Sequence, residues 1–150
     1  MILRVMIVED EDMIRNGLVK TLPWADMGCT VIGSAGDGKS GLEQIVERRP
    51  DVVITDIRMP EMDGFEMLER ALAVYRFHII IFTSYAEFDY AQKAISIHAY
   101  DYLLKPLDEK RLAELLARIR ETEEPQEQLE TPGSFSAEEL LKRLAYTDEY

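Results

Sequence analysis

The stretch "DVVITD", residues 51–56, decides the fold class of this chain. Its residues 52–55 are apolar or β-branched with no polar alternation, and they end at Asp56. A strand of this kind is buried on both faces, which is the usual situation in parallel sheets covered by helices. Four segments of similar composition surround it along the chain, at residues 3–9, 29–35, 78–84 and 101–105.

Segments with helical spacing follow these strands. Apolar residues recur every three or four positions, and Asp108 is placed to cap the last helix, which carries Leu112, Leu115, Leu116 and Ile119 on one face. Five strand–helix units with right-handed crossovers predict an α/β fold, a doubly wound five-stranded parallel sheet with helices on both faces. A chain of 150 residues is expected to fold as one ordinary domain around one core.

Composition and charge exclude several classes of protein. The formal net charge is −12, and residues 121–150 hold nine acids against two bases, so these residues would repel nucleic acid phosphates. No apolar run approaches the roughly 20 residues of a membrane span, and the N-terminus indicates a buried strand rather than a signal peptide. We therefore expect a cytoplasmic protein with no membrane partner, in which the single cysteine, Cys29, is a core residue.

The sequence divides into three expected regions. A globular domain over residues 1–121 is followed by an acidic linker over 122–135, which is poor in large apolar groups. Ser136 and Glu139 form a capping-box signal that predicts a short helix over 136–150. This helix is either a frayed C-terminus or the start of a truncated downstream region.

Reactive side chains leave the carboxyl ends of four predicted strands. The carboxylates of Glu9, Asp10 and Asp56, the hydroxyl of Thr83 and the ammonium of Lys105 occupy these positions. Open α/β sheets bind ligands at this edge, so the five groups are expected to converge. Crowded carboxylates favour a hard divalent cation such as Mg²⁺, and one carboxylate could act as a nucleophile toward a phosphoryl group that Lys105 and Thr83 stabilise.

Four phrases carry a resemblance to a known family. The phrases "MIVEDE", "DVVITDIRMPEMDGFEML", "IIIFTSYAEF" and "DYLLKPLD" resemble, in order and spacing, the receiver domain of two-component response regulators over residues 3 to about 120. The resemblance implies a flavodoxin-like sheet with strand order 2-1-3-4-5. It also implies that Asp56 accepts a phosphoryl group from a sensor histidine kinase.

The resemblance assigns further roles to the residues around Asp56. It implies that Mg²⁺ or Mn²⁺ is held by Asp10, Asp56 and the backbone carbonyl of Arg58, with Glu9 assisting through water and with no other cofactor. Lys105 would contact the phosphoryl group, and its bond to Pro106 would be cis. The domain would not be an enzyme in the ordinary sense, but a phosphoacceptor that assists its own phosphotransfer and dephosphorylation.

The family's conformational switch also has counterparts here. Thr83 would move toward the phosphoryl oxygens and Tyr102 would move from an exposed to a buried rotamer. This changes the face made by the helix at 86–97, the strand at 101–105 and the helix after it. The change would produce a homodimer that controls transcription, while Arg58 and Tyr85 would tune the lifetime of the phosphoaspartate.

The phrases "TSYAEFDYAQKAI" and "DYLLKPLD" are similar to those of receivers joined to AraC-type helix-turn-helix output domains. No such domain is found in these 150 residues, so DNA contact would need an output domain outside them. The sequence departs from the family where His98 and Ala99 replace a common glycine, which predicts a tight or strained turn before the last strand.

Two alternative functions remain. "GSAGDGKS", residues 33–40, fits the phosphate-binding pattern G-x-x-x-x-G-K-[ST], which favours a nucleotide hydrolase. Against it, the strand uses residues through about 35, and Asp37 would put a negative charge where a phosphate should lie. We expect Asp37 to cap the next helix instead. The other alternative is a phosphorylation-independent receiver-like adaptor, which would normally lack part of the acidic pocket or the lysine.

Overall fold

The computed structural model describes residues 1–123, in which five strands alternate with five helices. In chain order these elements are β1 Leu3–Val8, α1 Asp12–Thr21, β2 Cys29–Ala35, α2 Gly38–Arg48, β3 Val52–Thr55, α3 Gly64–Leu72, β4 His78–Thr83, α4 Phe88–Ser96, β5 Asp101–Leu104 and α5 Glu109–Glu123. The five predicted strand–helix units are confirmed.

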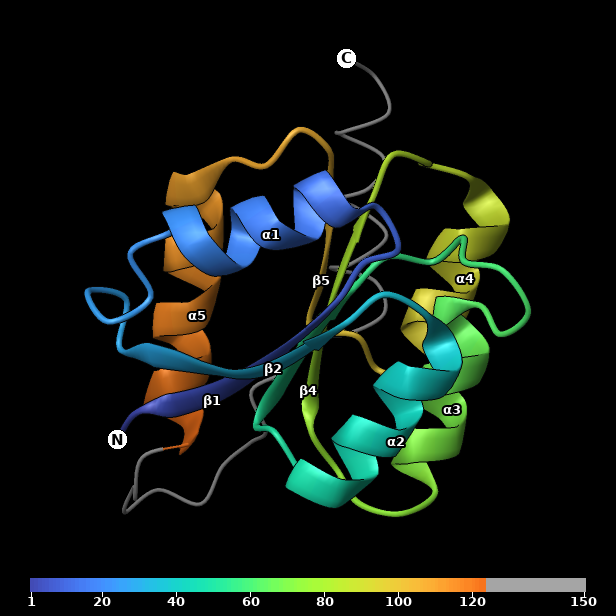
Figure 1. Ribbon diagram of the computed structural model, residues 1–150, viewed down its shortest axis with the longest axis horizontal. Coiled ribbons are helices and arrows are strands. Elements are labelled where there is room, and N and C mark those ends of the chain that lie inside the picture. The colour runs from blue at the N-terminus through green and yellow to red at the C-terminus, as the bar shows by residue number, and fades with distance from the viewer. Residues whose placement is uncertain (124–150) are drawn as a thin grey trace.

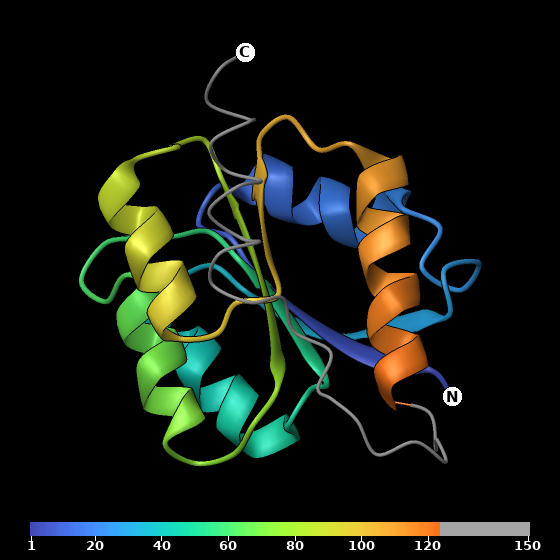
Figure 2. The same cartoon turned by 180° about the vertical axis from the view of Figure 1, so that it is seen from behind.

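The strands form one parallel sheet in the order β2-β1-β3-β4-β5. Helices α1 and α5 cover one face of the sheet, and α2, α3 and α4 cover the other (Figures 1 and 2). In the register, Val8 of β1 lies beside Thr55 of β3, which lies beside Ile81 of β4. The residues that follow these strands therefore emerge together at one edge of the sheet. The predicted flavodoxin-like fold is confirmed.

The sheet separates two apolar clusters rather than leaving the single core that chain length suggested. Met6, Val8 and Ile79 point toward α2, α3 and α4, whereas Leu3 and Ile7 belong to the cluster beneath α1 and α5. All four residues of β3 are buried, because both faces of this central strand are covered. This double burial is the reason why the strand carries no polar alternation.

Local capping residues fix where several helices begin. The Asp37 carboxylate accepts a hydrogen bond from the Ser40 N–H at 2.7 Å, as the sequence predicts, and Asp108 accepts from Lys110 and Arg111 at the start of α5. His98 adopts a left-handed backbone conformation with φ 59°, which confirms the strained turn expected before β5.

Helix α5 continues to Glu123, so residues 122 and 123 of the expected linker are helical. The rest of that linker and the helix expected at 136–150 lie outside the described residues. Within residues 1–123, no helix has the length and apolar character that a bilayer crossing requires.

Candidate functional site

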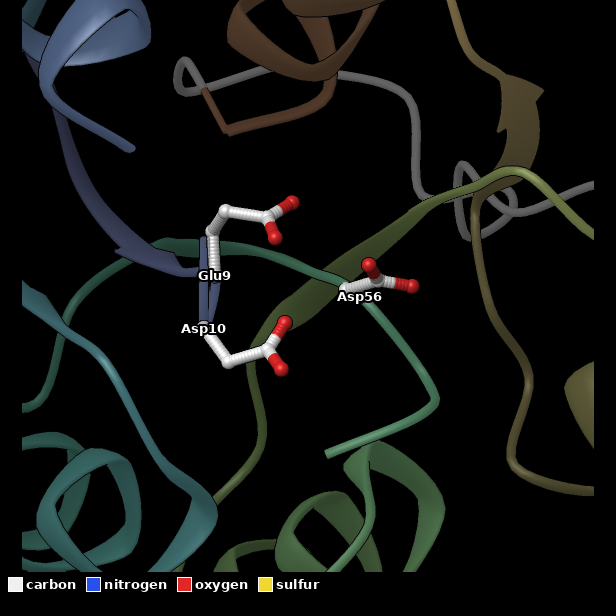
Figure 3. Close-up of side chains that lie close together, drawn as sticks. All are labelled: Glu9, Asp10 and Asp56. Carbon is white, nitrogen blue, oxygen red and sulfur yellow. The ribbon is translucent and has the colours of Figure 1, made fainter. Parts of the chain in front are cut away.

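Three carboxylates meet at the carboxyl edge of the sheet. Glu9 and Asp10 follow β1 and Asp56 follows β3, and Figure 3 shows their side chains gathered above the strand ends. One oxygen from each lies within 4.8 Å of the others. Glu9 and Asp56 are buried, with exposed fractions of 1% and 7%. Burial weakens solvent screening, so these negative charges repel one another strongly.

Lys105 is the counter-charge that the fold brings to the carboxylates. Its Nζ lies 2.8 Å from Oε1 of Glu9 and 2.9 Å from Oδ2 of Asp56. Burial is the largest single effect and opposes the ammonium charge, but hydrogen bonding and Coulombic attraction to Glu9 and Asp56 together outweigh it and raise the pKa of Lys105. The peptide bond between Lys105 and Pro106 is cis. One cation therefore serves two buried anions, which leaves the cluster with excess negative charge.

Glu9 differs from an ordinary surface carboxylate. Burial raises its pKa, and the nearby Asp56 charge adds to this effect, while Lys105 and the Glu11 N–H act in the opposite direction. Its Oε2 accepts that N–H at 3.1 Å. Oε2 thus accepts a hydrogen bond and Oε1 pairs with Lys105, so the Glu9 carboxylate is held beside those of Asp10 and Asp56.

Backbone contacts hold Asp56 in place. Its Oδ1 accepts the Ile57 N–H at 2.6 Å, and its own N–H donates to Val8 O at 3.0 Å. Gly64 packs against the Asp56 carbonyl so closely that an added Cβ would lie 2.2 Å from that oxygen. A side chain at position 64 would therefore displace the loop that carries Asp56.

Thr83 and Tyr102 are connected through the loop between β4 and α4. The Tyr85 N–H donates to Thr83 Oγ1 at 3.4 Å, and the Tyr102 hydroxyl donates to the Tyr85 carbonyl. Thr83 is fully buried and Tyr102 is 5% exposed. Tyr102 therefore occupies an inward rotamer, and its hydroxyl is tied to the loop that follows Thr83.

Arg58 reaches from the loop after β3 across to the loop after β4. Its guanidinium stacks on the Tyr85 ring at 3.6 Å from the centroid, donates to the Tyr90 hydroxyl at 2.7 Å and pairs with Glu87 at 2.5 Å. The hydrogen bond to Tyr90 leads the effects that raise the pKa of Arg58. The two loops beside Asp56 are thus bridged by one exposed side chain.

The glycine-rich stretch at 33–40 is occupied by contacts within the protein. The Asp37 carboxylate already binds the helix N-terminus, and a Cβ at Gly38 would lie 2.3 Å from the Met62 carbonyl. A Cβ at Gly36 would lie 2.7 Å from Nη1 of Arg15. These glycines leave space for Met62 and Arg15. The stretch also lies at the end of β2, an edge strand that β1 separates from β3 and Asp56. Its geometry does not favour the nucleotide-hydrolase alternative.

The donor set fits a hard divalent cation. Three carboxylate oxygens within reach of one another, in a pocket with one competing ammonium, are the ligand type that Mg²⁺ prefers. No cysteine or histidine belongs to this group among the described residues.

Sequence reasoning did not single out four residues that shape the site: Gly64, Arg15, Glu87 and Tyr90. Gly64 stands in the quoted phrase "MDGF", where an Asp-Gly pair before a helix signals a tight approach. Arg15 interrupts the apolar face of α1, which was a weak signal. Glu87 and Tyr90 carried no signal, because only the tertiary structure brings them to Arg58.

A family model and curated relatives both relate this chain to response regulators. The family model described as the response regulator receiver domain matches residues 5–117. The transcriptional regulatory protein HptR of Staphylococcus aureus (strain N315) is 36% identical over 150 residues, covering 98% of this chain and 59% of that protein. An uncharacterized response regulatory protein of Staphylococcus epidermidis is 36% identical over 149 residues with the same coverage. The chain spans about three fifths of the length of these curated relatives.

Solved structures show the same architecture. The receiver domain of AraT, a response regulator from Geobacillus stearothermophilus, superposes with a TM-score of 0.73 at 39% identity, covering 81% of this chain and 95% of that domain. The N-terminal domain of an uncharacterized protein from Wolinella succinogenes has a TM-score of 0.71 at 36% identity, covering 79% and 94%.

Proposed function

Because the chain belongs to the response regulator receiver domain family, we propose that it accepts a phosphoryl group from a sensor histidine kinase onto Asp56. The observation that carries this proposal is the pairing of buried Asp56 with Lys105 beside two further carboxylates. Receiver domains in general act as phosphoacceptors and bind Mg²⁺ at an acidic pocket.

In the proposed transfer, one carboxylate oxygen of Asp56 attacks the phosphorus of a phosphohistidine. A new O–P bond forms while the N–P bond breaks, and the departing imidazole takes a proton. The Ile57 N–H and Lys105 hold the Asp56 carboxylate before the reaction. Lys105 is close enough to follow the charge onto the phosphoryl oxygens, and Thr83 supplies a hydroxyl from the neighbouring strand.

The proposed cation site comprises Asp10, Asp56 and the backbone carbonyl of Arg58, with Glu9 acting through water. Mg²⁺ or Mn²⁺ bound there would neutralise charge that develops on the phosphoryl oxygens. The protein residues orient the carboxylates, and Lys105 limits their mutual repulsion. The same site would assist hydrolysis of the phosphoaspartate.

We propose that Thr83 and Tyr102 form the switch. The hydrogen bond from Tyr102 to the Tyr85 carbonyl supports this role, because it links the rotamer of Tyr102 to the loop after Thr83. Phosphorylation would draw Thr83 toward Asp56 and so fix the loop against Tyr102. The surface of α4, β5 and α5 would then favour homodimer formation.

Arg58 and Tyr85 are proposed to tune the phosphoaspartate lifetime. Their stacked side chains bridge the two loops beside Asp56, so they would restrict the approach of water. The Arg58→Ala substitution is expected to speed hydrolysis of the phosphoaspartate. Intact-mass measurements over time monitor the loss of the phosphoryl group. Arg70→Ala, on the exposed face of α3, is the control, and an unchanged rate in Arg58→Ala would contradict the tuning role.

The wider role is proposed from the resemblance to receivers with AraC-type output domains. Transcription control would require DNA contact by such a domain, joined through the expected linker after residue 121. The names of the HptR relatives support a regulator of transcription. The cytoplasmic location expected from the sequence stays a prediction.

The decisive experiment is phosphorylation by a small phosphodonor in the presence of Mg²⁺, measured by intact mass. Wild type is expected to gain one phosphoryl group, Asp56→Asn to gain none, and Asp26→Asn, in an exposed loop, to behave as wild type. A wild-type chain that stays unmodified would overturn the proposal and favour the adaptor alternative. ATP binding that disappears on Lys39→Ala would instead favour the hydrolase.

A further inference from the structure

The carboxylate of Asp10 has no hydrogen-bond or ion-pair partner among residues 1–123, unlike Glu9 and Asp56, which both contact Lys105. Its direction therefore depends on the backbone of the turn between β1 and α1. The N-cap residue of α1, Glu11, makes no side-chain cap, so the usual anchor for such a turn is missing.

Arg15 supplies an anchor at this point. Its Nη1 donates to the Glu9 carbonyl at 2.7 Å, while Nη2 pairs with Asp12 at 2.6 Å. The Glu9 carbonyl belongs to the peptide plane that enters Asp10. Because the peptide unit is planar, holding that carbonyl fixes the direction of the N–Cα bond of Asp10, from which its side chain leaves the backbone.

Gly36 makes room for the guanidinium from the other side. A Cβ at this position would lie 2.7 Å from Nη1 of Arg15 and 3.3 Å from Cζ. The Arg15 side chain is 18% exposed, so it is largely enclosed between the turn after β1 and the loop after β2. Gly36, which lies within the glycine-rich stretch at 33–40, thus leaves space for Arg15.

We propose that Arg15 is a positioning residue for the cation site, which holds the Glu9 carbonyl so that Asp10 faces Asp56. This inference rests on the proposed function, because it concerns the same site. Arg15 does not contact the carboxylates of Glu9, Asp10 or Asp56, so it acts through the backbone of the turn.

The direction in which cation affinity changes when Arg15 is replaced separates a positioning role from a purely electrostatic one. A positive charge beside a cation site repels the cation, so removing the charge alone would tighten cation binding. Removing an anchor for a ligand would weaken binding, by about tenfold if Arg15 matters as much as typical groups that orient metal ligands. The two explanations predict opposite changes for the same substitution.

The test measures Mn²⁺ binding to the unphosphorylated 150-residue chain by water-proton relaxation. Arg15→Gln removes the charge and replaces the guanidinium donors with an amide on a shorter side chain, whereas Gly36→Ala keeps the charge and displaces the guanidinium. Both are expected to weaken Mn²⁺ binding by about tenfold. Arg15→Lys keeps the charge and one donor nitrogen, so its Mn²⁺ affinity should lie between that of these two variants and that of wild type. Arg70→Gln removes an equal charge from the exposed face of α3, and this variant should bind Mn²⁺ as wild type does.

Tighter or unchanged binding by Arg15→Gln, or wild-type binding by Gly36→Ala, would overturn the inference while leaving the proposed function intact. Absence of Mn²⁺ binding by wild type would overturn both. Circular dichroism checks that each variant is folded. If Arg15→Gln and Gly36→Ala both fail to fold, the contact serves the fold rather than the site, which also overturns the inference.

Discussion

At the amino end of the sheet the charged side chains complete backbone hydrogen bonds, whereas at the carboxyl end they face one another. Arg4 shows the first pattern, because its guanidinium donates to the carbonyls of Arg48 and Arg49 at 2.7 Å each. These carbonyls end α2 and would otherwise need water. The Asp51 carboxylate accepts the Arg4 N–H at 2.9 Å, so it too completes the backbone.

At the carboxyl end the balance is different. Glu9 and Asp56 share Lys105, and Asp10 adds a third carboxylate without a partner among the described residues. The pKa of Glu9 is raised by burial, which means that the fold holds this carboxylate at a free-energy cost. Satisfied charges at one end of the sheet therefore stabilise the fold, while the excess negative charge at the other end is available for a ligand.

Lys105→Met should give the largest effect. It leaves two buried carboxylates without a counter-charge, so we expect the free energy of unfolding at pH 7 to fall by about 3 kcal/mol. Phosphorylation by a small phosphodonor should slow by about 100-fold. Urea unfolding and intact-mass kinetics measure the two quantities. Lys20→Met, on the exposed face of α1, is the control. If both variants were equally stable, the carboxylates at the carboxyl end of the sheet would not depend on Lys105.

Arg4→Met tests the amino end. Loss of two charge-assisted hydrogen bonds at a partly exposed position should lower the free energy of unfolding by about 1–2 kcal/mol. The rate of phosphorylation should not change, because Arg4 lies at the opposite end of β1 from Glu9. Arg70→Met, which breaks only an exposed pair with Glu66, should cost less than about 0.5 kcal/mol. A slower phosphorylation rate in Arg4→Met would show that the two ends are coupled.

Glu9→Gln tests the cost of the excess charge. Burial raises the pKa of Glu9 in the folded protein, so the folded state binds this proton more tightly than the unfolded chain does. Its stabilising contribution is present at low pH and is lost as the pH rises through the folded pKa. Glu9→Gln should therefore be more stable than wild type at pH 7. The gain in the free energy of unfolding should be smaller than the losses expected for Lys105→Met and Arg4→Met. The difference should shrink as the pH falls from the raised pKa of folded Glu9 toward the ordinary glutamate range.

The measurement for this prediction is urea unfolding of wild type and variant at a series of pH values. Glu47→Gln, at an exposed position of α2, provides the baseline for removing one surface carboxylate. A stability difference that does not vary with pH would mean that Glu9 is not held at a cost.

His98→Gly should have the smallest effect. Glycine adopts the left-handed conformation at φ 59° without strain, but it also gives the unfolded chain more freedom. The net gain is expected to be about 0.5 kcal/mol by thermal unfolding, with no change in phosphorylation. His98→Ala keeps the strain and serves as the control. An equal gain from both substitutions would assign the effect to the imidazole rather than the backbone.

The sequence pattern was sufficient for the five strand–helix units and for the main groups of the site, and the resemblance to receiver domains supplied the strand order. Apolar strands without polar alternation specify burial on both faces, and this requirement is local to each strand. Because parallel strands end at one edge, the positions of Glu9, Asp10, Asp56 and Lys105 directly after strands also predicted their meeting. The cap at Asp37 followed from local side-chain preferences, and the strained turn at His98 was expected because His98 and Ala99 replace a glycine common in the family.

How these groups are held depends on contacts that form only in the folded chain. Arg15 meets the Glu9 carbonyl because Gly36, from another loop, leaves space for it, and no local pattern encodes that approach. Arg58 bridges to Glu87 across 29 positions of the chain, and the inward rotamer of Tyr102 depends on the Tyr85 carbonyl. The chain order determined which reactive groups share an edge, whereas packing between loops determined their orientation, because orientation depends on contacts between segments distant in sequence.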